Sequence, residues 1–491
     1  MLALYIILTI FSIIILLMGI AAINAVRMRK DFPDGKEFDM ESDGIDPDRH
    51  AKSLSEIIKV PTVSRYGNKD MTNIYRLHNK LEQLYPNIHS KLEKIDIDGA
   101  LLFKWKGENA DDKPILLMSH MDVVEATGGW KYEPFSGTIA DGKIWGRGAV
   151  DTKGSLCAIL EAVEHLIEDG VTPHCDVYIA SSNNEEITGD GAIKTVEYLY
   201  EKGITLDLVM DEGGAVMSSV AGGMSGSSAM VGIFEKGRAN IKFTAHSPGG
   251  HASTPFKNNP FERLSKFMHT IENKRIFKKK LTDPVRHMYK AMTPYMSFRY
   301  RFVLGNLWLF GPILPYFMGK LGGQANALVS TTCVFTMAKG SNGANVIPQQ
   351  ASVTANMRFM IHQGLQESYE KVARLAAKLD IDMEMITGFD YSKVANMKTY
   401  AYKYVERSIA NCFGDIPIIP YVMMAGTDSR HYTKICDCVL RFVPLMMTNE
   451  QLASAHAINE NLSIESLERA VIFYKDFIKN YKRDNLQKEL K

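Results

Sequence analysis

The longest uninterrupted hydrophobic stretch lies at the N-terminus, where residues 2–26 carry no charged side chain. At a rise of about 1.5 Å per residue, a helix of this length crosses a hydrocarbon core of about 30 Å. Nothing basic precedes the stretch, and Arg27, Arg29 and Lys30 follow it, which favours an uncleaved single-pass anchor over a signal peptide. The same basic flank favours a cytoplasmic catalytic domain. Residues 27–49 are predicted to form a linker.

Short apolar runs farther along the chain each end in polar residues, at 114–118, 176–180 and 206–210. Buried runs of this length with helices between them predict the sheet of an α/β fold. After Asp151, apolar residues recur at helical spacing until Gly170, which predicts one of those helices. Ligands of open α/β sheets bind beyond the carboxyl ends of strands. The polar residues at these strand ends are therefore candidates for chemistry.

Alternation of apolar and polar residues at 239–245 and 351–359 predicts two half-exposed strands. A basic and aromatic stretch at 278–320 lies between them. Glycines and prolines interrupt it, so no apolar run reaches the length of a second membrane helix. These changes in pattern predict a catalytic domain in two parts, 50–234 and 395–485, with an inserted lid or dimerisation domain at 235–394.

Composition and charge narrow the class of protein without identifying it. The chain has 491 residues, of which 46% are hydrophobic, so two or more packed units are expected and disorder is excluded as the main state. The net charge is +1, so no global field attracts nucleic acid, and no nucleic-acid partner is predicted. Six scattered cysteines include no C-x-x-C pair, which favours free thiols.

The residues at the strand ends suit zinc, which binds His nitrogen and carboxylate oxygen. His120 and Asp122 are two residues apart on an extended segment and so face the same side, where Asp122 could fix the imidazole tautomer. Asp151 precedes the predicted helix. Glu185 and Glu186 are adjacent, so one could bind metal while the other handles a proton.

Two further residues extend this set: Asp211 at the end of the third strand, and His456 late in the chain. Each residue taken alone is more often structural than catalytic. Together, at three successive strand ends, they favour a site in which two zinc ions share a carboxylate and activate water. The chain has no H-E-x-x-H, P-loop or G-x-S-x-G motif, which argues against other hydrolase and NTPase classes.

At this point the chain resembles the M20 metallopeptidases, most closely the branch of carboxypeptidase S and the N-fatty-acyl-amino-acid hydrolases. The resemblance covers roughly residues 50 to 480 and implies a zinc-exopeptidase-like α/β catalytic domain with an inserted α+β lid. The segments that carry it are SHMDVV (119–124), WGRGAVDTKG (145–154), NEEITG (184–189), DEGG (211–214), GGHAS (249–253) and AGTDSR (425–430).

The resemblance also implies a role for each metal ligand. Asp151 would bridge two zinc ions. His120 and Asp211 would complete one site, and Glu186 and His456 the other. Cobalt or manganese could occupy the same ligands.

Further roles implied by the resemblance concern the substrate. Glu185 would be the general base. His251 in the lid would stabilise the oxyanion, and in dimeric relatives this His comes from the neighbouring subunit, which allows a homodimer here. Arg358 would grip a free carboxylate, and Asn345 and Gly426 would be further binding positions.

The sequence therefore predicts hydrolysis of a C-terminal peptide bond or of an N-acyl amino acid. Two alternatives stay open. One is a protein of the same fold that binds metal and ligand without turnover. The other is a deacylase of a non-peptide amide, because the same activated water would cleave a peptide amide and a non-peptide amide.

Overall fold

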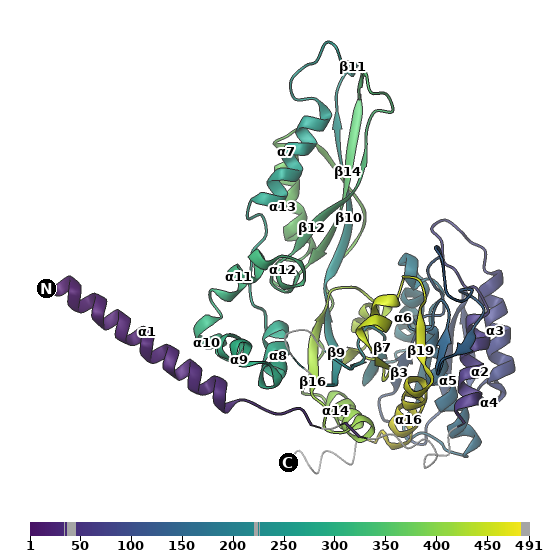
Figure 1. The fold of residues 1–491 in the computed structure, drawn as a ribbon. Coiled ribbons are helices and arrows are strands. Elements are labelled where there is room, and N and C mark those ends of the chain that lie inside the picture. Colours follow the sequence, from purple (N-terminus) through teal and green to yellow (C-terminus); the bar gives the residue numbers. More distant parts are fainter. Residues whose placement is uncertain (34, 37–45, 220–223, 225, 483–491) are drawn as a thin grey trace.

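The computed structural model describes residues 1–33, 35–36, 46–219, 224 and 226–482. Three parts are visible in Figure 1: a long N-terminal helix, a broad α/β unit, and a narrow lid that rises from it. None of the six cysteines, all of which lie in the described residues, forms a disulfide, as their scattered spacing predicts.

The α/β unit is built on one large mixed sheet. Strands β3, β6 and β7 are parallel neighbours in it, so their carboxyl ends lie at the same edge. All three confirm the buried strands predicted from the apolar runs. In spatial order the strands are β1 (Glu93–Ile97), β2 (Ala100–Trp105), β6 (Val177–Ser181), β3 (Ile115–Met118), β7 (Leu208–Asp211), β17 (Val439–Arg441), β9 (Ser228–Glu235), β8 (Val216–Met217) and β18 (Met446–Met447), and β16 (Ile418–Met423) also pairs with β9.

Helices pack against this sheet, and a small second sheet joins the loops near its edge. The helix predicted after Asp151 is α5, which runs from Lys153 to Glu168 and is buried along most of its length. It packs against both α2 and α16. The helices are α2 (Pro47–Ile58), α3 (Thr72–Leu84), α4 (Pro86–Lys91), α6 (Gly191–Glu201), α14 (Tyr400–Phe413), α15 (Asn449–Ser454) and α16 (Ile464–Asn480), and the small sheet holds β4 (Thr138–Ala140), β5 (Lys143–Trp145) and β19 (Asn461–Ser463).

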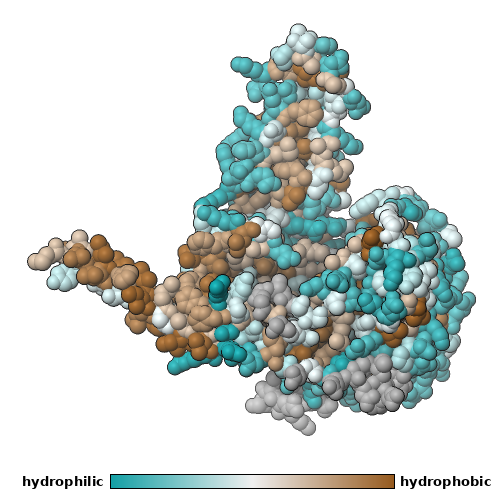
Figure 2. Space-filling view, in the orientation of Figure 1, coloured by the Kyte–Doolittle hydropathy of each residue, from teal (hydrophilic) through white to brown (hydrophobic). Residues whose placement is uncertain are grey.

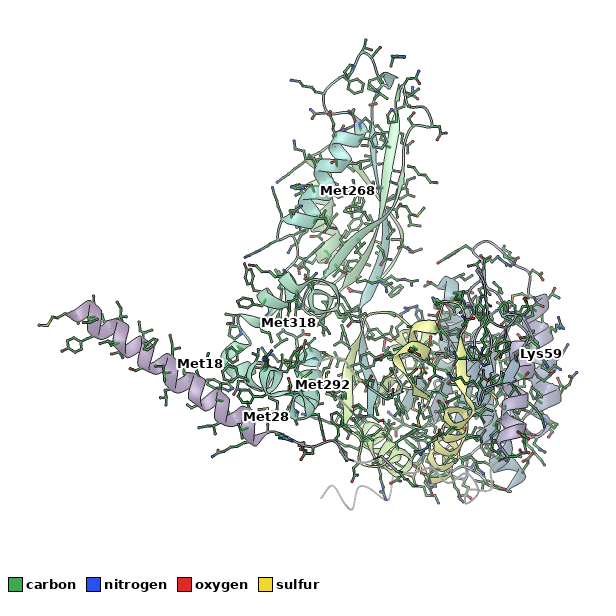
Figure 3. All side chains as sticks on the ribbon, viewed as in Figure 1. Met18, Met28, Lys59, Met268, Met292 and Met318 are labelled. Carbon is green, nitrogen blue, oxygen red and sulfur yellow. The ribbon has the colours of Figure 1, made fainter. Side chains whose placement is uncertain are left out.

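The lid has a sheet and a hydrophobic core of its own. Its antiparallel strands are β12 (Thr332–Lys339), β14 (Gln350–Phe359), β10 (Gly237–His246) and β15 (Asp382–Phe389), in that order. Helices α7 (Pro260–Asn273) and α13 (Leu365–Ala377) pack on this sheet, and Phe243, Phe267 and Phe359 are fully buried between the layers. Met268 on α7 is partly buried and packs against the same core, and Figure 3 shows its place in the lid. The predicted alternating strands are β10 and β14, and β11 (Gly250–His251) pairs with β13 (Val346–Ile347) at the tip.

Part of the insert packs against the large unit instead of the lid. Buried Val285, Met288 and Met318 belong to the core of the α/β unit, and α8 lies against β16. The predicted domain boundaries remain a prediction, but this segment joins the larger core. Its helices are α8 (Asp283–Met292), α9 (Phe298–Leu304), α10 (Leu307–Phe310), α11 (Leu314–Leu321) and α12 (Gly323–Val329).

The N-terminal helix α1 (Leu2–Arg27) contacts the rest of the protein near its C-terminal end, and most of its length projects away from it (Figure 1). Among the described residues it is the one helix long and apolar enough to cross a membrane, although a signal sequence passes the same test. Its surface is almost wholly hydrophobic in the space-filling view (Figure 2).

Candidate active site

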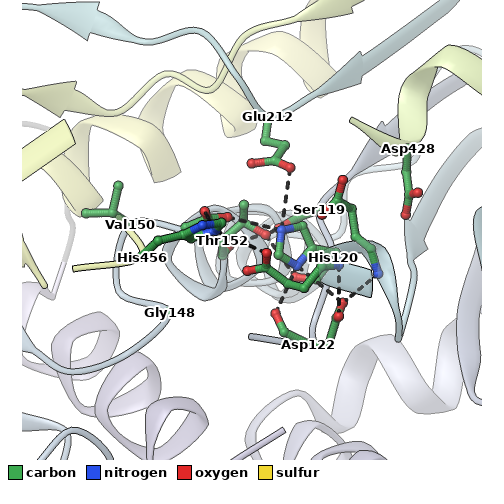
Figure 4. Close-up of polar contacts among 12 residues, drawn as sticks. Ser119, His120, Asp122, Gly148, Val150, Thr152, Glu212, Asp428 and His456 are labelled. Carbon is green, nitrogen blue, oxygen red and sulfur yellow. Dashed lines mark hydrogen bonds and ion pairs between the residues drawn. The ribbon is translucent and has the colours of Figure 1, made fainter. Parts of the chain in front are cut away.

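His120 follows β3 directly and is held in one orientation by the chain around it. Its Nδ1 lies 2.9 Å from the main-chain oxygen of Asp122. Because that oxygen can only accept, Nδ1 carries a proton, and Nε2 is the ring nitrogen left to bind a metal ion. Nε2 lies 3.1 Å from Oδ1 of Asp151. Figure 4 shows the His120 ring between the side chains of Asp122 and Glu212. The imidazole is thereby oriented as a metal-binding His is.

Asp151 stands between two histidines at the turn before α5. Its Oδ1 faces His120, and its Oδ2 lies 3.0 Å from Nε2 of His456. Two oxygens of one carboxylate therefore point to two different imidazoles. This is the geometry expected of a carboxylate that bridges two metal ions.

His456 and Glu186 form the second half of the cluster. Nε2 of His456 lies 3.1 Å from Oε2 of Glu186, while the other oxygen, Oε1, is buried without a hydrogen-bond partner in the described chain. His456 follows α15 with a positive φ of 60°, and its side chain is 55% exposed. One buried carboxylate and one open imidazole leave this half of the cluster accessible from solvent.

Glu185 and Glu212 lie on the other side of His120. Oε1 of Glu212 is 3.5 Å from Nε2 of His120, and ligand atoms of all three residues lie within 4.8 Å of one another. Burial and the charge of Asp151 raise the pKa of Glu212 to about 8. Burial, with Asp428 and Glu212 close by, also raises the pKa of Glu185 well above its ordinary value.

The structure corrects the sequence prediction at Asp211. Its side chain is buried and turned away from the cluster, where Oδ2 accepts a hydrogen bond from the amide of Ser429 at 3.0 Å. The next residue, Glu212, faces His120 instead. Glu212 therefore replaces Asp211 as the candidate ligand.

Asp122 organises the loop that carries the two glutamates. Its fully buried carboxylate accepts hydrogen bonds from the main-chain amides of Glu185 at 3.0 Å and Glu186 at 3.2 Å. The hydroxyl of Ser64 donates a third at 2.6 Å. Asp122 thus fixes the start of the short helix η1 (Glu185–Ile187) and, through its own main chain, the ring of His120.

Glu460 supports Asp151 and was missed by the sequence analysis. Its buried carboxylate accepts main-chain hydrogen bonds from Gly148, Val150 and Asp151 at 2.8 to 3.0 Å. It also pairs with the buried guanidinium of Arg147 at 2.7 Å. The only sequence signal was a Glu four residues after His456, which is too weak to single it out.

The donor set of the cluster fits divalent metal ions. Two imidazoles and four carboxylates converge, and a buried oxygen of Glu186 has no hydrogen-bond donor. Carboxylates this close repel one another unless a cation lies between them. Imidazole and carboxylate are the ligands that zinc takes in catalytic sites.

Three arginines gather next to the cluster. Arg358 on β14 is directly opposite Arg238 on β10, and the guanidinium of Arg430 lies 3.9 Å from the ring of Phe389, over which Arg238 also lies. Burial, with Arg238 and Arg430 close by, lowers the pKa of Arg358 to about 10. Gly426 gives Arg430 its space, since a Cβ there would approach Nη1 of Arg430 to 2.4 Å. An anion placed among the three cations would relieve their repulsion.

The remaining predicted residues, His251 and Asn345, lie together at the tip of the lid. The amide of Ala252 donates to the carbonyl of Asn345 at 2.9 Å, and β11 and β13 hold the two segments side by side. Figure 1 shows this tip far from the carboxyl edge of β3 and β7. Within one chain, His251 and Asn345 are therefore brought together with each other and not with the metal cluster.

Comparison with known sequences identifies the family to which the chain is similar. Residues 116–480 match the family described as peptidase family M20/M25/M40. A zebrafish (Danio rerio) protein named N-fatty-acyl-amino acid synthase/hydrolase PM20D1.1 is 32% identical over 90% of this chain and 88% of its own length. A Dictyostelium discoideum protein named probable carboxypeptidase S-like 2 is also 32% identical, over 88% of this chain and 84% of its own.

Solved structures share the fold at lower identity. A family M20 metallo-carboxypeptidase from Sulfolobus solfataricus superposes with a TM-score of 0.65 at 19% identity, over 88% of this chain and 99% of its own. Human carnosine dipeptidase 1 superposes with a TM-score of 0.64 at 16% identity, over 88% of this chain and 96% of its own. Both similarities support the predicted α/β fold with an inserted domain.

Proposed function

Because the chain belongs to peptidase family M20/M25/M40, and is a metallopeptidase or amidohydrolase of that family, we propose that it hydrolyses an amide whose amine side carries a free carboxylate. The substrate is a small peptide cut at its C-terminal bond, or an N-acyl amino acid. The observation that carries the proposal is Asp151, whose two oxygens face His120 and His456 separately.

The residues of the cluster divide into two sets of ligands for two zinc ions. His120 and Glu212 would hold one ion, Glu186 and His456 the other, and Asp151 both. Bound there, the ions would activate a water molecule as nucleophile and polarise the carbonyl of the scissile amide. Cobalt or manganese would satisfy the same ligands.

Glu185 is the proposed general base. It lies beside His120 and Glu212, and its main-chain amide is anchored on Asp122. It takes a proton from the attacking water and later gives a proton to the leaving nitrogen. One C–O bond forms and the C–N bond breaks, so the products are a carboxylic acid and an amine.

The arginine cluster is the proposed site for the free carboxylate of the substrate. Arg358 would make the bidentate contact, with Arg238 and Arg430 supplying further positive charge. Gly426 keeps the space beside Arg430 open. Substrates with an amidated carboxyl group would lose this attraction.

The tip of the lid would act across a homodimer. His251 and Asn345 are paired with each other at the tip, so we propose that they reach the cluster of a second copy and stabilise the oxyanion there. The single-pass anchor is a further proposal, in which α1 crosses the membrane with Arg27, Arg29 and Lys30 on the cytoplasmic side.

The names of the relatives favour amides of amino acids without choosing one kind. One relative is named for N-fatty-acyl amino acids and the other for a carboxypeptidase. A deacylase of non-peptide amides, and a binding protein without turnover, are the competing functions. The same experiment separates all of them.

The test is turnover by the full chain, supplied with zinc, on matched substrates. N-acyl amino acids and short peptides are each offered with a free and with an amidated C-terminus. We expect cleavage of the free acids only, and a loss of about 10²- to 10⁴-fold in kcat in Glu185→Gln with the metal content unchanged. Equal cleavage of free and amidated forms would refute the role of the arginines. Metal binding without any cleavage would favour the binding protein.

A further inference from the structure

The end of α1 is docked onto the helices α9 and α10. Asn306 is fully buried there, donates to the main-chain oxygen of Ala21 at 3.0 Å, and accepts from the side chain of Asn24 at 3.1 Å. Nε of Arg301 donates to the main-chain oxygen of Ala25 at 2.8 Å. Removal of α1 would break these three hydrogen bonds and leave Asn306 without these partners. The C-terminal end of α1 is therefore an integral part of the fold.

The same contact continues to the last turn of α1. Ala21, Asn24, Ala25 and Met28 are spaced so that they share one face of the helix. Gly305 allows the close approach, since a Cβ there would lie 2.4 Å from Sδ of Met28. Figure 3 shows Met28 at this junction and Met18 farther out on the free part of α1. The rest of α1 projects away from the protein.

This docking sets the depth of α9 and α10 relative to a bilayer. A helix of 26 residues is about 39 Å long, roughly 9 Å longer than the hydrocarbon core. If α1 spans the bilayer, its last one to two turns lie in the headgroup region. The helices docked on those turns then lie at the same level, against the membrane surface.

Large apolar side chains cover the surface of α9, α10 and α11. We call this surface the platform. Figure 2 shows its hydrophobic area beside the base of α1. Its members, with their exposed fractions, are Phe298 (45%), Tyr300 (47%), Trp308 (54%), Ile313 (52%), Phe317 (55%) and Leu321 (79%).

The segment that forms the platform carries positive charge. The 46 residues from 284 to 329, which run from α8 to α12, contain five Lys or Arg and no Asp or Glu, whereas the whole chain has 56 acidic residues. At its edge Arg275 and Lys320 flank the ring of Tyr316, at 4.6 and 4.7 Å. Aromatic side chains with cations and no acids are typical of segments that rest on an anionic membrane.

We propose that the platform is embedded in the interfacial region of the same bilayer that α1 crosses. Apolar side chains enter the headgroup boundary, and the surrounding cations contact acidic headgroups. The platform is rigidly joined to the α/β unit, because α8 beside it packs on β16 and is buried in the larger core. The membrane contact therefore fixes the orientation of the catalytic sheet relative to the bilayer.

The test uses the full chain in vesicles that contain acidic lipids and lipids brominated on their acyl chains, which quench tryptophan at short range. The chain has four tryptophans, of which Trp308 is the one on the platform. We expect quenching by the brominated lipids in the wild-type chain and its loss in Trp308→Phe. Equal quenching in the two proteins would overturn the proposal.

Two further variants separate the membrane from other occupants. Phe317→Glu with Leu321→Glu should weaken the quenching of Trp308, whereas Ile139→Glu, an exposed apolar residue of the α/β unit, should leave it unchanged. Chemical crosslinks between platforms of two copies, with no quenching, would show that a second copy covers this face and would contradict the proposal. A mature chain that lacks α1 would contradict it as well.

Discussion

Replacing Glu460 by Gln tests whether the turn that carries Asp151 depends on a buried charge. The carboxylate receives three main-chain N–H groups and the guanidinium of Arg147. Burial and the charge of Asp151 raise the pKa of Glu460, while the amides of Gly148 and Asp151 and the guanidinium of Arg147 act in the opposite direction. In the Gln variant one oxygen can still accept from Val150 and Asp151. The new amide group would instead meet Gly148 and Arg147, which are both donors.

The expected cost follows from those lost contacts. Leaving a buried charge without its partner costs about 3 to 5 kcal/mol, so we expect Glu460→Gln to lower the free energy of unfolding by about 3 kcal/mol. Because Glu460 orients Asp151, zinc affinity should also fall by about 10- to 100-fold. Urea denaturation and zinc competition measure the two effects, with exposed Glu133→Gln as the matched control. A change below about 0.5 kcal/mol with unchanged zinc affinity would refute the reasoning.

Four other variants test the remaining parts of the account. Glu212→Gln should lower the bound metal from two ions toward one, measured by elemental analysis, while Asp211→Asn should keep both; the reverse pattern would restore the sequence prediction. Arg358→Lys should lower kcat/KM for free acids by about tenfold and leave amidated analogues unchanged, because Lys cannot make the bidentate contact. Burial, with Arg49 and His50 close by, lowers the pKa of His165 to about 4, so only the unfolded chain takes up this proton between pH 6.5 and 4. Wild-type stability should therefore fall more steeply over that range than that of His165→Gln, by at most about 3 kcal/mol, and parallel curves would contradict this.

The strand ends and the helix after Asp151 could be predicted because their signal is local. Short apolar runs and helical spacing depend on neighbours in the sequence, and the structure confirms β3, β6, β7 and α5. The choice between Asp211 and Glu212 could not be made in this way. All four residues of β7 are buried, so the strand has no apolar and polar alternation to show which side chain faces the site.

Contacts between distant segments explain the other omissions. Arg238 and Arg358 meet through the register of β10 and β14, and Arg430 joins them from the short helix η3 (Asp428–Lys434), which follows β16. No pattern within any one of these segments indicates that pairing. Likewise the sequence pattern predicts that the stretch at 278–320 belongs to the lid, but its buried side chains pack on the α/β unit.

A zinc titration of the metal-free full chain, with hydrolysis of an N-acyl amino acid followed at each step, tests the central claim most directly. The account predicts that the chain binds two ions and that activity rises with their binding. It also predicts that His120→Ala, which removes a ligand facing Asp151, reduces both. Hydrolysis that is equally fast without metal, or zinc binding that does not depend on His120, would contradict it.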